Sequence, residues 1–184
     1  MEPDDRVQDV DALIRAVHDT GGSVTEAELT QILDHVARAG FDEQAREAAR
    51  GPLRGQMWQG QPVIGSTRLP PAVRHWLLHA LVNREWPVGT TLAGYIDSLR
   101  RITLDPDSGV FVNTYQSEIS LGIMRESREL RGPGGHAWIL VQYRVSTGHW
   151  TTGFQPEDGL EEITKPDWGQ VRWMRRPTIR SAPS

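Results

Sequence analysis

The chain of 184 residues contains no cysteine. This absence excludes disulfide bonds, thiolate metal sites and cysteine nucleophiles together. Long apolar runs are also missing, so the sequence predicts no segment that crosses a bilayer. The first residues, MEPDDRVQDVD, are acidic where an export signal would be basic and apolar. We therefore expect a cytoplasmic protein that makes no contact with a membrane.

Several motifs of cofactor and nucleophile chemistry are absent as well. The glycines form neither GxGxxG nor the GxxxxGKS or GxxxxGKT word of a phosphate loop, and no serine lies in GxSxG. His75 and His79 are four residues apart, a spacing that can place two imidazoles on one metal ion. Their segment, HWLLH, lacks the glutamate of HExxH, and no third ligand is evident. We expect no metal ion and no cofactor.

Lysine is nearly absent, because 19 of the 20 basic residues are Arg and Lys165 is the only Lys. A GC-rich genome explains this bias, although arginine also suits phosphate binding because its planar fork donates two parallel hydrogen bonds. Residues 1–50 hold 5 Arg against 12 Asp and Glu, whereas residues 51–184 hold 15 basic against 12 acidic residues. The acidic segment is a candidate docking surface for a protein partner, or simply a charged helical surface.

The pattern of the first 50 residues is helical. Apolar residues recur at helical spacing from Val10 to Val17. Thr25 and Glu28 form a capping box that predicts the start of a second helix, and Gly40 is placed to end it. Residues 42–50 predict a third, short helix.

The remainder predicts a small hairpin, two helices and then strands. Residues 53–64 favour two short strands around a turn, and Pro70-Pro71 opens a helix that Trp86-Pro87 ends. Thr90 or Thr91 caps the next helix. Strands are then expected at Val110–Tyr115, Ile119–Met124, His136–Val145 and His149–Phe154.

This order predicts an α+β fold, in which N-terminal helices precede an antiparallel meander of about four strands packed on helices. We divide the chain into an acidic helical arm or subdomain (1–50), an α+β core (51–160) and an irregular basic tail that contains Trp (161–184).

The last predicted hairpin has two alternative registers. A three-residue loop at 146–148 places Trp150 on the same face as Arg144 and Gln142. A four-residue loop at 145–148 sorts the faces more cleanly, and we prefer it because apolar matching normally fixes the register. Ile139, Val141, Tyr143, Trp150 and Phe154 then share the core side, and Gln142, Arg144, His149 and Thr151 share the other side.

This polar set suits phosphate chemistry. Histidine transfers protons near neutral pH, and arginine binds phosphate through paired hydrogen bonds. We therefore consider His149 and Arg144 as candidate catalytic residues, with Thr151 or Gln142 orienting the phosphate. A solvated sheet face explains each of these residues singly.

Two further segments carry candidate ligand-binding residues. Arg125, Arg128 and His136 flank a glycine-rich loop at 132–135 that would let the chain approach a ligand, although a salt-bridged hairpin tip is the favoured interpretation. In the tail, Arg residues flank a Trp side chain, which suits either binding to a nucleic-acid backbone or packing of the tail on the domain. These tail residues are Arg172, Trp173, Arg175 and Arg176.

The order of elements over residues 90–156 resembles the small ribonuclease toxins of the barnase, RelE and colicin type. The resemblance implies metal-independent cleavage of RNA by groups that project from the sheet. The resemblance implies catalytic roles for Arg125, Arg144, His149 and Thr151, with His136 as a second acid or base. Two alternatives stay open: a binding module for protein or nucleic acid, and an accessory protein of a mobile element.

Overall fold

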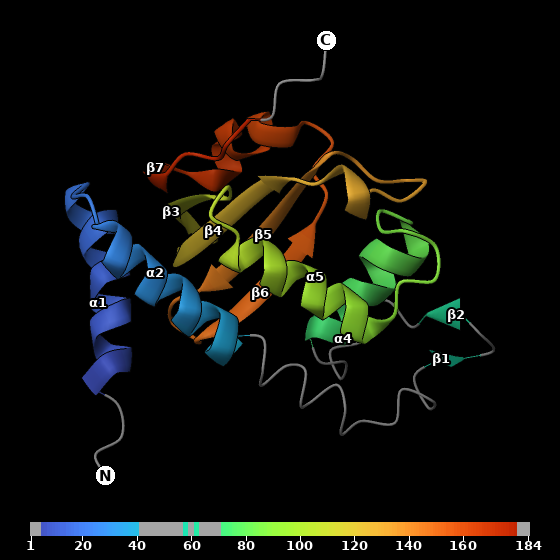
Figure 1. The fold of residues 1–184 in the computed structure, drawn as a ribbon, viewed down its shortest axis with the longest axis horizontal. Helices are drawn as coiled ribbons and strands as arrows, with labels where there is room; N and C mark the ends of the chain where they lie inside the picture. Colours follow the sequence, from blue (N-terminus) through green and yellow to red (C-terminus); the bar gives the residue numbers. More distant parts are fainter. Residues whose placement is uncertain (1–4, 41–56, 59–60, 63–70, 180–184) are drawn as a thin grey trace.

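A computed structural model of the protein describes residues 5–40, 57–58, 61–62 and 71–179. It confirms the α+β class, because N-terminal helices precede an antiparallel sheet (Figure 1). The small strands β1 (Met57–Trp58) and β2 (Gln61–Pro62) pair antiparallel, as the sequence predicts for that region. The helix expected at 42–50 lies outside the described residues.

The main sheet has five strands in the order β6-β5-β4-β3-β7, and each neighbouring pair is antiparallel. The four meander strands lie where the sequence predicts them. They are β3 (Gly109–Tyr115), β4 (Glu118–Glu126), β5 (Trp138–Arg144) and β6 (His149–Phe154).

The fifth strand corrects the expectation of an irregular tail. β7 (Arg172–Arg175) pairs with β3 at the sheet edge. Its four residues are all partly buried, so they lack the clear apolar and polar alternation by which a strand is recognised in a sequence. The tail is therefore partly built into the sheet.

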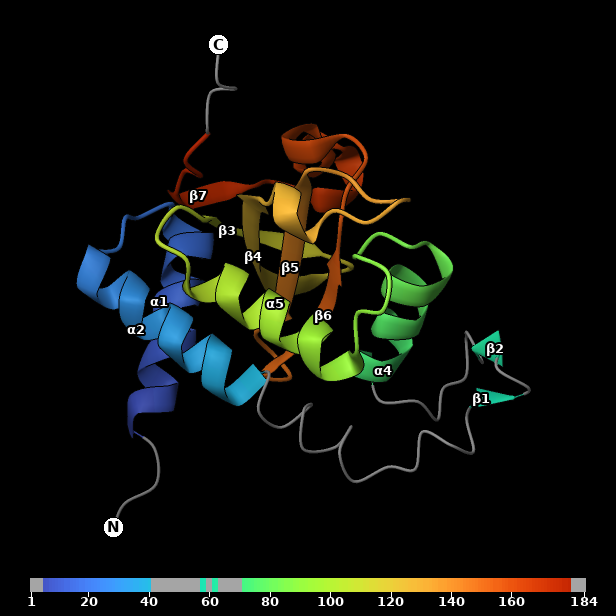
Figure 2. The same ribbon diagram turned by 45° about the vertical axis from the view of Figure 1, so that its right-hand side comes forward.

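One face of the sheet is covered by three helices, α1 (Asp5–Thr20), α2 (Glu26–His35) and α5 (Leu92–Leu104), as Figure 2 shows. The buried residues of these helices and of the sheet form one apolar cluster, so the acidic N-terminal helices share the core of the sheet. None of the helices in the described parts of the chain is long and apolar enough to span a membrane.

Two predicted helix caps are present. At α2, the hydroxyl of Thr25 accepts from the backbone N–H of Glu28, and the carboxylate of Glu28 accepts from the backbone N–H of Thr25. At α5, the hydroxyl of Thr91 accepts from the N–H of Gly94. Gly40, by contrast, does not form a left-handed cap. It lies in the π-helical turn η1 (Val36–Gly40), where a Cβ would be 3.4 Å from the Tyr143 ring, an ordinary contact distance, so the position does not require glycine.

The helix α4 (Pro71–His75) continues as the π-helical segment η3 (Trp76–Val82) and packs along β6. It ends at Val82, before the predicted end at Trp86, and the chain reverses at Arg84, whose φ is 57°. Trp86 is instead buried in the core, with its ring edge-on to Tyr95.

The second face of the sheet has a smaller cover. The 3₁₀ turns η5 (Gly159–Thr164) and η6 (Pro166–Trp168) place Ile163 and Trp168 over Phe111, Met124 and Leu140. Further along β5 on this face come Gln142 and then Arg144, and the candidate site lies there.

Candidate anion-binding cavity

The loop that joins β5 to β6 has the four-residue form that we prefer from the sequence. Arg144 pairs with His149, and Tyr143 pairs with Trp150, so residues 145–148 form the loop. Gly148 has a φ of 69° and donates its N–H to the carbonyl of Arg144. The register therefore places the guanidinium and the imidazole on one face, and the two large rings on the other.

A β-bulge changes the faces further along β6. Gln142 pairs with Thr152, whereas Tyr143 pairs with Trp150, so Thr151 is the extra residue. One extra residue moves every later side chain to the opposite face. Thr152, and not Thr151, is therefore the partner of Gln142. Phe154 was expected on the face of Tyr143, and this expectation is wrong: it packs in the cluster of the second face.

A half-open cavity of about 720 Å³ lies at this end of the sheet, between the β5–β6 hairpin and the start of the helix α4. Among the residues that the structure describes, its lining contains two Arg and three His side chains but no Asp or Glu. Such a lining favours an anionic ligand, because no carboxylate opposes its charge. The five residues are Arg74, His75, His79, Arg144 and His149.

His75 faces the bulge of β6. Its Nδ1 atom is 3.3 Å from the Oγ1 atom of Thr152, and its ring stacks on that of His79 with centroids 5.6 Å apart. Burial lowers the pKa of His75 to about 4, helped by the charges of His79 and Arg74, while a hydrogen bond to the backbone of Thr151 opposes the shift. His75 is therefore neutral near pH 7.

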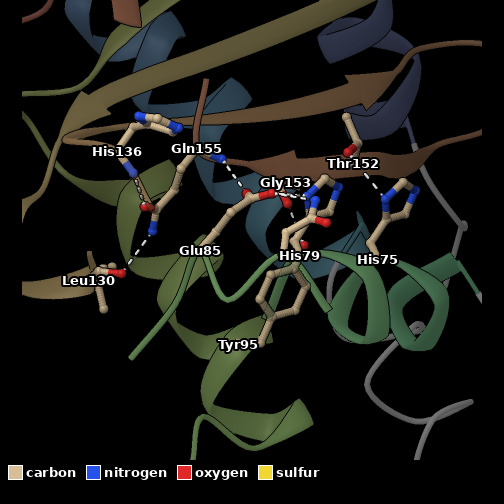
Figure 3. A network of polar contacts seen from close by, with 10 residues as sticks. His75, His79, Glu85, Tyr95, Leu130, His136, Thr152, Gly153 and Gln155 are labelled. Carbon is tan, nitrogen blue, oxygen red and sulfur yellow. Dashed lines mark hydrogen bonds and ion pairs between the residues drawn. The ribbon is translucent and has the colours of Figure 1, made fainter. Parts of the chain in front are cut away.

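His79 is held by a buried carboxylate, as Figure 3 shows. Its Nδ1 atom lies 2.7 Å from Oε1 of Glu85, which is 6% exposed and also accepts from the side chain of Asn83 at 2.9 Å. The second oxygen of Glu85 accepts from the backbone N–H of Gln155 at 2.8 Å. These contacts fix the carboxylate, which in turn orients the imidazole and leaves its Nε2 atom for other partners.

Two buried polar atoms of the cavity lining have no hydrogen-bond partner among the described residues. They are the Nε2 atom of Gln142, whose side chain is 1% exposed, and the Nε atom of Arg144. Buried donors are normally satisfied, and leaving one unpaired costs about 1–3 kcal/mol. Two such donors in one cavity are the feature expected of a site that a ligand completes.

Arg125 lies far from this cavity. It forms ion pairs with Asp105 and, at 3.5 Å, with Asp107. It pairs across strands with Ile139, on the face covered by helices and near the opposite end of β5 from Arg144. Its contacts are those of a structural ion pair that joins the end of α5 to the sheet.

His136 and Arg128 also lie outside the cavity lining. His136 precedes β5, and its backbone N–H donates to the Oε1 atom of Gln155 at 2.9 Å (Figure 3). Because it lies eight residues before Arg144 along an extended strand, the two are on the order of 25 Å apart. Arg128 pairs with Glu126 at 3.1 Å on the surface.

The glycine-rich loop after Arg131 packs against the protein's own backbone. A Cβ on Gly132 would be 1.9 Å from the carbonyl oxygen of Trp86, and one on Gly134 would be 2.1 Å from that of Asn83. The N–H groups of both glycines donate to backbone carbonyls of this segment. The loop therefore needs glycine so that two stretches of chain can lie together.

The basic residues of the tail lie on β7 or just after it, at the sheet edge opposite β6. Arg175 donates to the carbonyls of Ser108 and Asp105, and Arg176 lies 4.9 Å from the centre of the Trp173 ring. Arg172 donates to the side chain of Gln170 at 3.3 Å. These residues pack the tail on the domain, away from the cavity.

Sequence reasoning thus missed Arg74, His79 and Glu85 as parts of the candidate site. The spacing of His75 and His79 is visible in the sequence, but it points to a metal pair. In the structure the two rings are stacked within 4° of parallel, and no group of three or more metal-binding side chains occurs among the described residues. The sequence spacing therefore gives no sign of the contact that His79 makes with Glu85.

No protein-family model, curated protein or solved structure that was compared with the chain matches it, so the resemblance to small ribonuclease toxins stays a prediction that rests on the order of elements.

Proposed function

We propose that the protein cleaves phosphodiester bonds of RNA at this cavity, by proton transfer between imidazoles and without a metal ion. The observation that carries the proposal is the pairing of Arg144 with His149 at a cavity lined by further Arg and His side chains. A phosphodiester carries one negative charge, and this charge grows on the oxygens as the phosphorus is attacked.

Arg144 and Arg74 supply the positive charge of the site. His75 is neutral near pH 7, so it adds no charge and acts as a hydrogen-bonding group. An arginine that holds a phosphate through two hydrogen bonds stabilises the developing charge and fixes the orientation of the bond to be broken. Arg144 lines the cavity, and its guanidinium carries several donors for this purpose.

The proton transfers are assigned to the other two imidazoles. His79, oriented by Glu85, takes the proton of the ribose 2′-hydroxyl through Nε2, and the 2′-oxygen attacks the phosphorus. The bond from phosphorus to the 5′-oxygen breaks, and His149 gives this oxygen a proton. The products are a 2′,3′-cyclic phosphate and a free 5′-hydroxyl group, and a proton returned through water restores the enzyme.

This assignment keeps Arg144 and His149 from the residues proposed on sequence grounds and adds Arg74 and His79. Thr151 lines the cavity but has no catalytic role in it. Arg125 and His136 have no part in it, because neither lines the cavity. RNA is then the partner at the cavity, and a cytoplasmic location fits such a substrate. A protein partner at the acidic helices stays a separate prediction.

The test is an RNA cleavage assay with a labelled single-stranded oligonucleotide that contains one ribonucleotide, with EDTA present. We expect Arg144→Ala and His149→Ala to lose at least a hundredfold in rate with little change in melting temperature. Arg128→Ala and His136→Ala are matched controls, since both lie outside the cavity lining, and we expect them to keep their activity.

Three outcomes contradict the proposal. They are an unaltered oligonucleotide with every RNA sequence tried, cleavage that EDTA abolishes, and cleavage that survives Arg144→Ala. RNA that is retained but left intact supports a binding module at the same cavity instead.

A further inference from the structure

We infer that the cavity also recognises a nucleobase, through the side-chain amide of Gln142, so that its ligand is a nucleotide unit and not a phosphate group alone. This inference rests on the anion site proposed above. It assigns the inner part of the cavity, which the phosphate chemistry leaves unused.

The first observation is the state of Gln142. Its side chain is 1% exposed, it lines the cavity, and its Nε2 atom has no hydrogen-bond partner within the described parts of the chain. Across the strand pair lies Thr152, whose hydroxyl is shared with His75. A buried donor that no acceptor satisfies is costly, and a ligand that accepts from it removes this cost.

The second observation is the spacing along β5. Gln142 and Arg144 are two residues apart on the same face, so their backbone positions are roughly 7 Å apart. Gln142 is the deeper of the two, because Arg144 is only partly buried next to the loop. A nucleotide has the same order of parts, with a sugar between its charged phosphate and its uncharged base. With the phosphate at Arg144, the base lies toward Gln142.

The third observation is the chemistry of the walls. Tyr115 and Phe154 also line the cavity and are only partly buried, and aromatic side chains stack on bases of any sequence. A carboxamide has a donor and an acceptor side by side, and this pattern matches the hydrogen-bonding edge of a base. The volume of about 720 Å³ is that of a small-ligand site and far exceeds a single phosphate.

The experiment is calorimetric titration with ribose 5-phosphate and with each of the four nucleoside 5′-monophosphates. We expect at least one nucleotide to bind about tenfold more tightly than ribose 5-phosphate, since one well-formed base contact is worth about 1–3 kcal/mol. Gln142→Leu removes that tenfold difference and leaves the affinity for ribose 5-phosphate unchanged. Gln142→Glu keeps the shape, replaces the donor by an acceptor, and also weakens the nucleotide.

Asn113→Leu is the matched control. Asn113 is a fully buried amide on β3 that does not line the cavity, and its Nδ2 atom donates to the carbonyl of Trp168 at 2.9 Å. This variant loses stability but keeps the preference for the nucleotide. Equal binding of ribose 5-phosphate and all four nucleotides overturns the inference and leaves the anion site standing, as does an unchanged preference in Gln142→Leu.

Failure of the proposed function gives a different result. If nucleotides bind with the expected preference but RNA is not cleaved in the separate assay, the base site is supported and the cleavage is refuted. A chain that binds neither ribose 5-phosphate nor any nucleotide refutes both the anion site and the base site.

Discussion

The Nδ1 atom of His79 lies 2.7 Å from the carboxylate of Glu85, a residue that is buried beyond the end of the same helix. The contact exists because the helix ends at Val82 and the chain turns back at Arg84. The carboxylate is itself held by Asn83 and by the backbone of Gln155. A ring held in this way keeps one orientation, which general acid–base catalysis requires.

The first prediction concerns this pair. Glu85→Gln keeps the shape of the side chain but removes its charge, so the carboxylate that fixes the orientation of His79 is lost. We expect the rate constant of RNA cleavage to fall about 10- to 100-fold, with little change in KM. Asn83→Ala, which removes only a neighbouring contact, is the control. An unchanged rate constant in Glu85→Gln would contradict the role of His79 as the base.

The second prediction concerns pH and stability. The pKa of His75 is about 4 in the folded chain, below its ordinary value of 6.5, so the unfolded chain binds more protons between these values. The contribution of neutral His75 to the free energy of unfolding is therefore fully present above pH 6.5, and it is lost as the pH falls toward 4. Each pKa unit corresponds to about 1.4 kcal/mol, and partial exposure of the ring reduces the loss to roughly 1–3 kcal/mol.

Urea unfolding at several pH values between 4 and 7 measures this loss. In His75→Asn the loss attributed to His75 should be missing, so the difference in unfolding free energy between the two proteins changes over this range. Parallel pH curves for the two proteins would show that His75 does not titrate as stated.

The third prediction separates structure from catalysis at Arg125. This side chain is 8% exposed and pairs with Asp105 and Asp107. Arg125→Met leaves two carboxylates without their cation, so we expect roughly 2–4 kcal/mol less stability in chemical denaturation. The rate of RNA cleavage per folded molecule should not change. If the rate of cleavage fell strongly while stability stayed unchanged, Arg125 would be catalytic and not structural.

The fourth prediction concerns the glycine-rich loop. Gly132→Ala places a methyl group 1.9 Å from the carbonyl oxygen of Trp86, and a backbone cannot move aside cheaply. We expect a loss of about 2–4 kcal/mol in unfolding free energy. Gly89→Ala is the control, because nothing lies within 4 Å of its new methyl group and its only cost is the φ of +86°, a strain that Gly132 does not share. It should cost only about 1 kcal/mol. Equal losses in both variants would contradict the steric argument.

The features that sequence reasoning finds are those set by a few neighbouring residues. The Thr25 capping box, the Thr91 cap and the turn at Gly148 each depend on contacts within four residues along the chain, and all are present. The strands of the meander follow from alternation that is plain in the sequence. These local rules place Arg144 and His149 opposite each other without knowledge of the rest of the fold.

The features that it misses depend on distant contacts or on one extra residue. Thr151-Thr152 gives no sign that the strand carries a bulge here, yet the bulge decides the face of Phe154. The helix that carries His79 reaches the hairpin only because α4 packs along β6, some seventy residues later in the chain. The sequence therefore predicts only the part of the cavity that the β5–β6 hairpin forms.

The pairing of β7 with β3 has a consequence for self-association. The strand β3 lies second from the edge of the sheet; it pairs with β4, the next strand along the chain, and with β7, a segment about sixty residues away. Until that segment arrives, one rim of β3 presents unpaired N–H and C=O groups. A chain that ends just after Gly169 would expose this edge of β3 permanently. Two such chains would pair through their β3 edges and form a continuous sheet.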